Sequence, residues 1–544
     1  MISFLKQHKR FGLALLMIFI FFLSFAIHYF FYWSKGFVPG EYYNLLIGRN
    51  WAQTGKISYE SAENVILSTE AVVSQGTPTN LGNKLTFFLY GFLFRLFGFH
   101  PELPLYTTFI LYSLAAVFIF LLVWRIFDWK IGLIAALLNL VAPFSLPSSN
   151  KIGYHEWAWF FLALALLFYF WSKERKLKHL ILTGLFLGLS MAAKNSFFVA
   201  LPAFLFLEFW EERNIIKKAI WRCAVLLIIF LVFSLPLVFM GGNDYLRELF
   251  NFPNKYNYSS SDFGHLFPDP YTFHYEKNDY LKNLIANKDT YPGGEFRLWG
   301  DSGSYIEYGL SIGFFKAQII TRIYSVWIYL KGFLSLVVFG GMFTWFLIML
   351  GIFELFKKRN YSLIFFSAVY FASWFFWMIF LKTSNYPQLL ILSPPILILA
   401  GLGIGKIGEM IAQSFYYPKF SAKISMAVAG IFLIFFFQIS WWSMRELYLN
   451  GEAERQLLKF ASSQKNSLDF SKKGVTAVGL SPDILSYYFD RSFVYFVPET
   501  IKKLADKKEL NQVFQKYNIT GFFGYDEETS KIIDKNTNNK LKSY

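Results

Sequence analysis

The stretch FGLALLMIFIFFLSFAIHYFFY, residues 11–32, decides the fold class of this chain. It is almost entirely apolar and aromatic, and it is long enough for a helix to cross a bilayer, which takes roughly 20 residues. Lys6, Lys9 and Arg10 precede it as in a signal peptide, but no cleavage site of the A-x-A type follows. We therefore expect an uncleaved membrane anchor at the N-terminus.

Similar apolar runs recur along the chain, at about 104–127, 131–147, 157–172, 179–193, 195–210, 218–240, 325–352, 361–381, 387–405 and 424–442. They predict a polytopic α-helical membrane protein with about 11 transmembrane helices (range 11–13). A shorter run, residues 85–99, contains Arg95. It is either a twelfth span or a helix lying at the membrane surface.

The composition agrees with a membrane protein. Of the 544 residues, 55% are hydrophobic and only 16% are charged, and the mean hydropathy is +0.38. These values exclude an ordinary soluble enzyme, a disordered chain and a disulfide-rich secreted module. The single cysteine, Cys223, excludes intrachain disulfides and any zinc or iron–sulfur site built on cysteines.

The net charge of +16 is a topology signal. With a cytosolic N-terminus, the short inner segments collect nineteen lysines and arginines, whereas the short outer loops hold three, Lys151, Lys194 and Lys382. This positive-inside bias would be lost if residues 85–99 formed a full span. The surplus charge thus orients the chain in the cytoplasmic (inner) membrane, and no nucleic-acid partner is needed to explain it.

This topology places nearly all of the soluble mass outside the cytosol, in residues 34–103, residues 241–322 and the tail from about 442. In the tail, the pattern predicts strands at 474–480, 492–497 and 521–525, with helices at 482–489 and 501–517. We expect two domains: a transmembrane domain, residues 1–442, and an extracytoplasmic α/β domain, residues 443–544.

Two acidic residues on the outer side are candidates for catalysis. Glu41 follows the breakers Pro39 and Gly40, and a helix is expected from Glu41 to Gln53. Glu156 lies at the outer mouth of the fourth span. Each carboxylate suits a general base or a metal ligand, but each also suits a helix start, where a negative charge complements the dipole.

Basic residues on the outer side contradict the inside bias and call for a reason. Lys194 lies in a tight outer turn, and Lys382 lies in another outer loop. Such lysines suit an anionic head group or phosphate; the alternative is that they extend to the interface. The long loop adds His265, Asp269 and His274, so a site for a divalent cation is left open.

The segment Gly403–Gly408 matches G-x-G-x-x-G. It follows an apolar span at its cytosolic end and not a strand of a βαβ unit, so a nucleotide site is not supported. Small residues for close helix packing are the better interpretation.

Several segments resemble the membrane-embedded glycosyltransferases with a C-type fold, in the bacterial branch related to protein O-mannosyltransferases and lipid A aminoarabinose transferases. The resemblance covers residues 1 to about 440. Its motifs are VPGEYYNLLIGRNWAQTGK (38–56), NKLTFFLY (83–90) with RLFG (95–98), His155-Glu156 with Phe160-Phe161, GLSMAAK (188–194), and SNYP (384–387) with SPP (393–395). In that family the segment that corresponds to residues 85–99 is peripheral to the membrane.

The resemblance implies transfer of a sugar from a polyprenyl-phosphate donor to an outward-facing acceptor, which is a lipid, a polysaccharide or a protein. An acidic residue of the first outer loop would be the base, here Glu41, with Glu156 as a second candidate. The implied substrate-binding residues are Tyr42, Tyr43, Lys84, Lys151, His155, Lys194, Arg297, Lys382 and Tyr386. Gly40 departs from the family, which often has aspartate there, and leaves two rivals open: a transporter or flippase of lipid-linked glycans, and an inactive glycan-binding relative.

Overall fold

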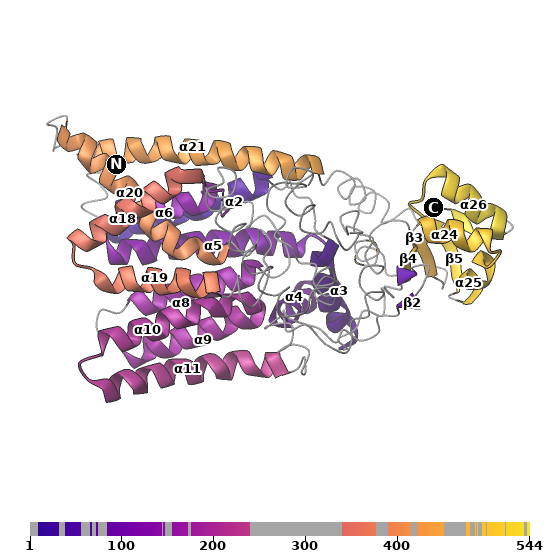
Figure 1. Cartoon of the computed structure of the whole chain (residues 1–544), viewed down its shortest axis with the longest axis horizontal. Helices are drawn as coiled ribbons and strands as arrows, with labels where there is room; N and C mark the ends of the chain where they lie inside the picture. Colours follow the sequence, from indigo (N-terminus) through magenta and orange to yellow (C-terminus); the bar gives the residue numbers. More distant parts are fainter. Residues whose placement is uncertain are drawn as a thin grey trace, which may run out of the picture.

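Figure 1 shows the computed structural model of the chain, with a bundle of long helices at one end and a small α/β unit at the other. The structure describes residues 9–31, 39–55, 66–67, 72–73, 84–143, 145–146, 155–171, 176–239, 340–376, 390–414, 421–450, 475–478, 485, 487, 492–496, 498–516, 518–537 and 541–543.

The bundle helices lie side by side, roughly along the long axis of the molecule (Figure 1). They are α2 (Lys9–Phe30), α5 (Leu103–Ile126), α6 (Trp129–Val141), α8 (His155–Trp171), α9 (Leu177–Ala193), α10 (Leu201–Glu211), α11 (Ile216–Phe239), α18 (Gly341–Lys357), α19 (Tyr361–Phe376), α20 (Ser393–Ser414) and α21 (Ser421–Asn450). A short 3-10 helix, η2 (Asn195–Ala200), leads directly into α10.

Each predicted span overlaps one of these helices. In the described part of the chain, five are long and apolar enough to cross a membrane: Phe11–Phe30, Leu103–Ile126, Ile216–Leu235, Leu390–Ser414 and Lys423–Trp442. The other six ranges hold shorter helices. The described helix in the predicted span 325–352 is α18, which begins at Gly341 and continues to Lys357.

The core of the bundle surrounds α20. In an apolar 18-residue stretch of the span Leu390–Ser414, 83% of the residues are buried, compared with 22% for such a stretch of α2. Close packing against α18 requires glycine on both helices: a Cβ added at Gly403 would lie 2.1 Å from the Leu347 carbonyl oxygen, and one at Gly351 would lie 2.1 Å from that of Leu399. The G-x-G-x-x-G segment is therefore a packing surface, as interpreted from the sequence.

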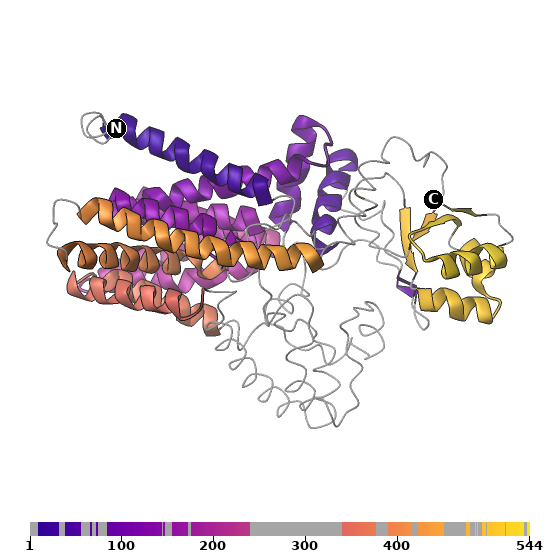
Figure 2. The ribbon, with the colours of Figure 1, turned by 90° about the horizontal axis from the view of Figure 1, so that it is seen from above.

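Two helices lie across one end of the bundle. These are α3 (Pro39–Thr54) and α4 (Lys84–Phe97), and Figure 2 shows them turned away from the direction of the bundle helices. With 14 residues, α4 is about 21 Å long, less than the roughly 30 Å of a bilayer's hydrocarbon core. The structure thus favours a surface helix for residues 85–99 over a twelfth span.

The α/β unit contains a six-stranded sheet of order β2-β1-β4-β3-β5-β6. Residues 475–543 supply β3 (Val475–Val478), β4 (Ser492–Phe496), β5 (Ile519–Phe523) and β6 (Lys542–Ser543), with α24 (Pro498–Asp506), α25 (Leu510–Lys516) and α26 (Glu527–Thr537). The three strands predicted in the tail are present. The boundary between residues 442 and 443 remains a prediction.

The sheet also takes two strands from the first outer loop. β1 (Ile66–Leu67) pairs in parallel with β4, and β2 (Val72–Val73) pairs antiparallel with β1. Neither strand is predicted from the sequence pattern. The tail and the loop that follows α3 therefore form one sheet.

The single helix predicted over residues 501–517 is wrong, because two helices, α24 and α25, occupy this segment. The chain leaves α24 at Lys508, which has a φ of 61°. The Lys508 N–H donates to the Ala505 carbonyl at 2.9 Å, and the Glu509 N–H donates to that of Leu504 at 2.8 Å. These bonds close α24 in the left-handed manner common at helix C-termini.

Candidate active site

A buried carboxylate marks the end of the bundle on which α3 and α4 lie. Glu156 is the second residue of α8, and its side chain is fully buried. The Tyr90 hydroxyl of α4, also fully buried, donates a hydrogen bond to Glu156 Oε1. The Tyr90 ring packs edge-on against Trp157, with ring centroids 6.0 Å apart. The surface helix α4 thus covers the first turn of α8.

The surroundings of the Tyr90 hydroxyl keep its proton in place. Burial, followed by the neighbouring Glu156 carboxylate, raises the pKa of the Tyr90 hydroxyl well above its usual range. Tyr90 therefore stays protonated and acts as the donor. The position of Glu156 in the first turn of α8 also favours a negative charge, because the helix dipole is positive there.

The same helix α4 contacts the C-terminal end of α9, where Lys194 lies. Thr86, one turn before Tyr90, donates its hydroxyl to the Ala193 carbonyl at 3.2 Å. Ser190 of α9 donates to the Ala158 carbonyl of α8 at 2.8 Å. Lys194 follows at the C-cap of α9, half-buried, where a cation complements the dipole. The structure thus brings Glu156 and Lys194 to one place, where α4, α8 and α9 meet.

The predicted helix that carries Glu41 is confirmed as α3, which begins at Pro39. It packs tightly on α4: a Cβ at Gly48 would lie 2.9 Å from the Phe87 carbonyl oxygen, and one at Gly91 would lie 2.4 Å from the Trp51 ring. Residue 41 precedes Gly48 by seven positions, so helical periodicity places it on the side of α3 that faces α4. The side chains of Glu41, Tyr42 and Tyr43 lie outside the described residues.

The remaining predicted substrate-binding residues divide into two groups. His155, the first residue of α8, is buried beside Glu156, with 3% of its surface exposed. Lys84 begins α4, but its side chain is outside the described part of the structure. Lys151, Arg297, Lys382 and Tyr386 are also outside it, as are His265, Asp269 and His274 of the long loop.

Neither Tyr90 nor Thr86 is predicted from the sequence as a site residue. Both lie in an aromatic run, LTFFLY, in which nothing distinguishes a polar contact from packing. The sequence also leaves open whether the protein has a site for a divalent cation. Among the described side chains, no group of three or more His, Cys, Asp or Glu residues is placed to hold a metal ion.

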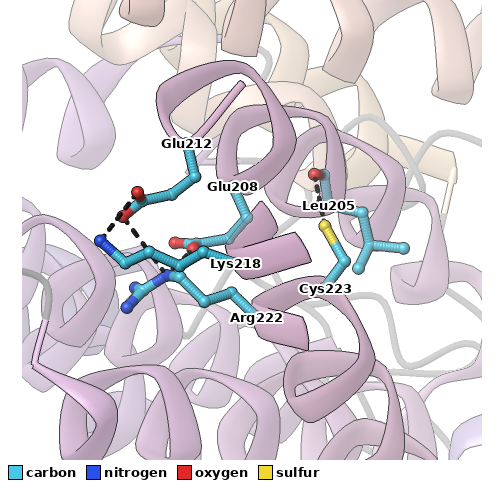
Figure 3. A network of polar contacts seen from close by, with 6 residues as sticks. All are labelled: Leu205, Glu208, Glu212, Lys218, Arg222 and Cys223. Atoms are coloured by element: carbon cyan, nitrogen blue, oxygen red, sulfur yellow. Dashed lines mark hydrogen bonds and ion pairs between the residues drawn. The ribbon is translucent and has the colours of Figure 1, made fainter. Parts of the chain in front are cut away.

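A second polar cluster, which contains a buried ion pair, joins α10 to α11 (Figure 3) at the end of the bundle opposite α3 and α4 (Figure 1). Arg222 Nε donates to Glu208 Oε2 at 2.5 Å and lies 3.9 Å from Glu212 Oε1, while Lys218 Nζ lies 2.9 Å from Glu212 Oε2. Glu208 and Arg222 are both buried. Two acids here face two bases, so the cluster neutralises itself. We interpret it as a clamp between the two helices and not as a part of the candidate site.

Comparisons with known proteins give this arrangement a context. A family model described as dolichyl-phosphate-mannose-protein mannosyltransferase matches residues 84–239, the segment that holds Tyr90, Glu156 and Lys194. The oligosaccharyltransferase of Archaeoglobus fulgidus in its apo form is similar in structure over 95% of this chain and 70% of its own, with a TM-score of 0.53 and 12% identity. The chain has the C-type glycosyltransferase fold.

Other solved structures agree with the C-type fold. ArnT from Cupriavidus metallidurans in the apo state has a TM-score of 0.50 and 11% identity, covering 98% of this chain and 90% of its own. AglB from Archaeoglobus fulgidus, in complex with an inhibitory peptide and a dolichol-phosphate, has a TM-score of 0.52 and 12% identity, covering 94% and 69%. No curated protein matches the sequence. The resemblance of the sequence to C-type glycosyltransferases is thus confirmed in the fold.

Proposed function

We propose that this protein is a membrane glycosyltransferase that moves a sugar from a polyprenyl-phosphate donor to an acceptor at the extracytoplasmic end of the bundle. The observation that carries the proposal is the meeting of α4, α8 and α9, where the buried Glu156 and the half-buried Lys194 share one end of a C-type fold. A structural neighbour of this fold was solved with dolichol-phosphate, a lipid phosphate of the class that leaves when the proposed donor has given up its sugar.

The chemistry needs a base for the acceptor and cations for the donor. A carboxylate accepts the proton of the acceptor hydroxyl while the oxygen of that hydroxyl attacks the anomeric carbon of the donor sugar. The bond from that carbon to the phosphate oxygen breaks, and polyprenyl phosphate leaves with the bonding electrons. Glu41 on α3 is the proposed base, with Glu156 as the second candidate. Lys194 neutralises the charge that develops on the leaving phosphate.

The positions of the basic residues support this sidedness. Of the residues predicted to be cytosolic, Arg125 and Lys358 lie at the C-terminal ends of α5 and α18, and Lys178, Lys217 and Lys423 lie near the N-terminal ends of α9, α11 and α21. These helix ends lie at the end of the bundle opposite α3 and α4 (Figure 1). By the positive-inside rule that end is cytosolic. We therefore propose that the candidate site faces the extracytoplasmic side of the cytoplasmic membrane and that no nucleic acid takes part.

Sugar transfer by Glu41→Gln and Glu156→Gln tests the assignment of the base. Full-length protein in liposomes is incubated with radiolabelled polyprenyl-phosphate sugars and cell-envelope acceptors. Loss of transfer by one variant, with donor binding retained, identifies the base. Glu409→Gln, at an exposed position on the opposite end, is the matched control and should transfer sugar normally. Normal sugar transfer by both variants would exclude Glu41 and Glu156 as the catalytic base.

Lys194→Met tests the donor site. Because a cation at the C-cap of α9 neutralises the donor phosphate in this proposal, donor binding should weaken by about tenfold or more. Unchanged donor affinity would exclude the phosphate role. If the wild-type protein moves a fluorescent donor between leaflets without transferring sugar, the protein is a flippase. If it binds donor and does neither, it is an inactive relative.

A further inference from the structure

Among the described residues, Tyr487 links the α/β unit to the end of the bundle that holds the candidate site. The Arg49 guanidinium of α3 donates to the Tyr487 carbonyl oxygen at 3.1 Å. The Tyr487 hydroxyl donates to the Pro101 carbonyl oxygen at 3.1 Å, in the link between α4 and α5. Tyr487 therefore joins α3 to the α4–α5 link, although it is separated from Arg49 by 438 positions in the sequence.

This contact is buried and has specific geometry. Arg49 is 2% exposed and Tyr487 is fully buried. The guanidinium carbon lies 5.6 Å from the centre of the Phe99 ring, and the Tyr487 ring meets Phe99 edge-on at 5.4 Å. Burying a guanidinium is costly unless its donors find acceptors. The Tyr487 carbonyl supplies one, in addition to Asn50 Oδ1 of α3 itself at 3.4 Å, so docking of the α/β unit adds a buried acceptor that orients Arg49.

A second attachment lies on the chain that follows α3. β1 pairs in parallel with β4, with Ile66 opposite Tyr495 and Leu67 opposite Phe496. The loop after α3 is thus bound into the sheet of the α/β unit. Since Gly48 already fixes α3 against α4, α3 is held by α4 on one side and by the α/β unit through Arg49 and β1.

We propose that Arg49 and Tyr487 are positioning residues for sugar transfer: docking of the α/β unit holds α3, and with it residue 41, against the end of the bundle. The part of this inference that concerns kcat rests on the proposed function, because it requires that the protein transfers sugar. Arg49 follows Glu41 by eight residues on one continuous helix. A helix transmits a displacement along its axis, so a loosened Arg49 misplaces the start of α3.

The test compares two arginines of the α3–α4 pair. Arg49→Gln removes the contact with Tyr487. Arg95→Gln is the matched control, because Arg95 bonds to the Trp51 and Ala52 carbonyls of α3 and is exposed. Arg49→Gln should lower kcat by about 10- to 100-fold, the effect of a misplaced catalytic group, with the donor KM within about twofold of wild type. Arg95→Gln loosens only the C-terminal end of α3, at an exposed position, and should lower kcat much less than Arg49→Gln does.

A disulfide rescue separates positioning from general damage. In a Cys223→Ser background, cysteines at the paired positions Ile66 and Tyr495 tether β1 to β4. The tether should restore most of the kcat lost in Arg49→Gln, and reduction of the disulfide should abolish the recovery. Unchanged kcat in Arg49→Gln, a parallel rise of the donor KM, or a formed tether without recovery would each overturn the proposal.

Hydrogen exchange keeps the test independent of the reaction. Amide exchange in β4, residues 492–496, should be faster in Arg49→Gln than in Arg95→Gln. Equal exchange in the two variants would show that Arg49 does not hold the α/β unit. If the wild-type protein transfers no sugar, the proposed function fails, whereas the exchange measurement and the yield of the disulfide still decide whether the docking exists.

Discussion

At the scale of single residues, the pairing of Tyr90 with Glu156 combines burial with a directed proton donor. A tyrosine is suited to this position because its ring packs among apolar groups while its hydroxyl supplies one hydrogen bond. Glu156 is fully buried, and a buried carboxylate is stable only when donors reach it. Tyr90 is therefore both a packing residue of α4 and a partner of the candidate catalytic carboxylate.

Removal of this hydroxyl gives a residue-scale prediction. Tyr90→Phe keeps the ring and deletes the donor to Glu156, so the protein should lose about 1–3 kcal/mol of stability, with slower sugar transfer. Thermal unfolding in detergent and the transfer assay measure both. Tyr106→Phe, at a position 42% exposed, is the control and should change neither. A wild-type unfolding temperature in Tyr90→Phe would contradict the role of the hydrogen bond.

At the scale of elements, buried ion pairs and glycines join the bundle helices. Glu208 of α10 and Arg222 of α11 form an ion pair in which both side chains are at most 7% exposed. Replacing one partner strands the other charge in an apolar setting, which costs far more than breaking an exposed pair. The stability of the α10–α11 hairpin should thus depend strongly on Glu208 and much less on the exposed Lys218.

Glu208→Gln should therefore destabilise the protein by roughly 3–5 kcal/mol. Lys218→Gln provides the contrast within the same cluster. Its side chain is 50% exposed where it meets Glu212, so the expected loss is below about 1 kcal/mol. Thermal unfolding in one detergent measures both variants. Equal losses would show that the buried pair is no more important than the exposed one.

The contact between α18 and α20 gives a second prediction at this scale. Gly403→Ala places a Cβ 2.1 Å from the Leu347 carbonyl oxygen, and backbone must move to accept it. The unfolding temperature should fall, because overpacking typically costs about 1–3 kcal/mol. A Cβ at Gly430 of α21 meets nothing within 4 Å, so Gly430→Ala should be neutral or stabilising. A stable Gly403→Ala would contradict the close approach of the helices.

At the scale of the whole molecule, the two ends of the bundle differ in their polar and charged residues. The self-neutralising charge cluster between α10 and α11 lies at the end where the predicted cytosolic residues gather, and the candidate site lies at the end where α3, α4 and the α/β unit meet (Figure 1). In a Cys223→Ser background, Lys531→Cys, whose lysine is 74% exposed, should react with an impermeant maleimide on intact cells or spheroplasts. Lys217→Cys should react only after permeabilisation. The reverse pattern would invert the proposed topology.

The sequence by itself determined the membrane class, the order of the spans, the packing role of the glycine segment and the strands of the tail. These features depend on local quantities: the length of apolar runs, the spacing of glycines and the alternation of strand and helix. It failed at residues 501–517, because the left-handed turn at Lys508 follows no glycine or proline that would announce it.

Only the tertiary structure decided what meets at the candidate site. Tyr90 reaches Glu156 across 66 positions and Tyr487 reaches Arg49 across 438, and no local pattern encodes such pairings. The addition of β1 to the sheet of the tail is likewise invisible in the sequence, since a two-residue strand has no periodicity of its own. Contacts between distant segments depend on how helices pack, which is a property of the folded chain as a whole.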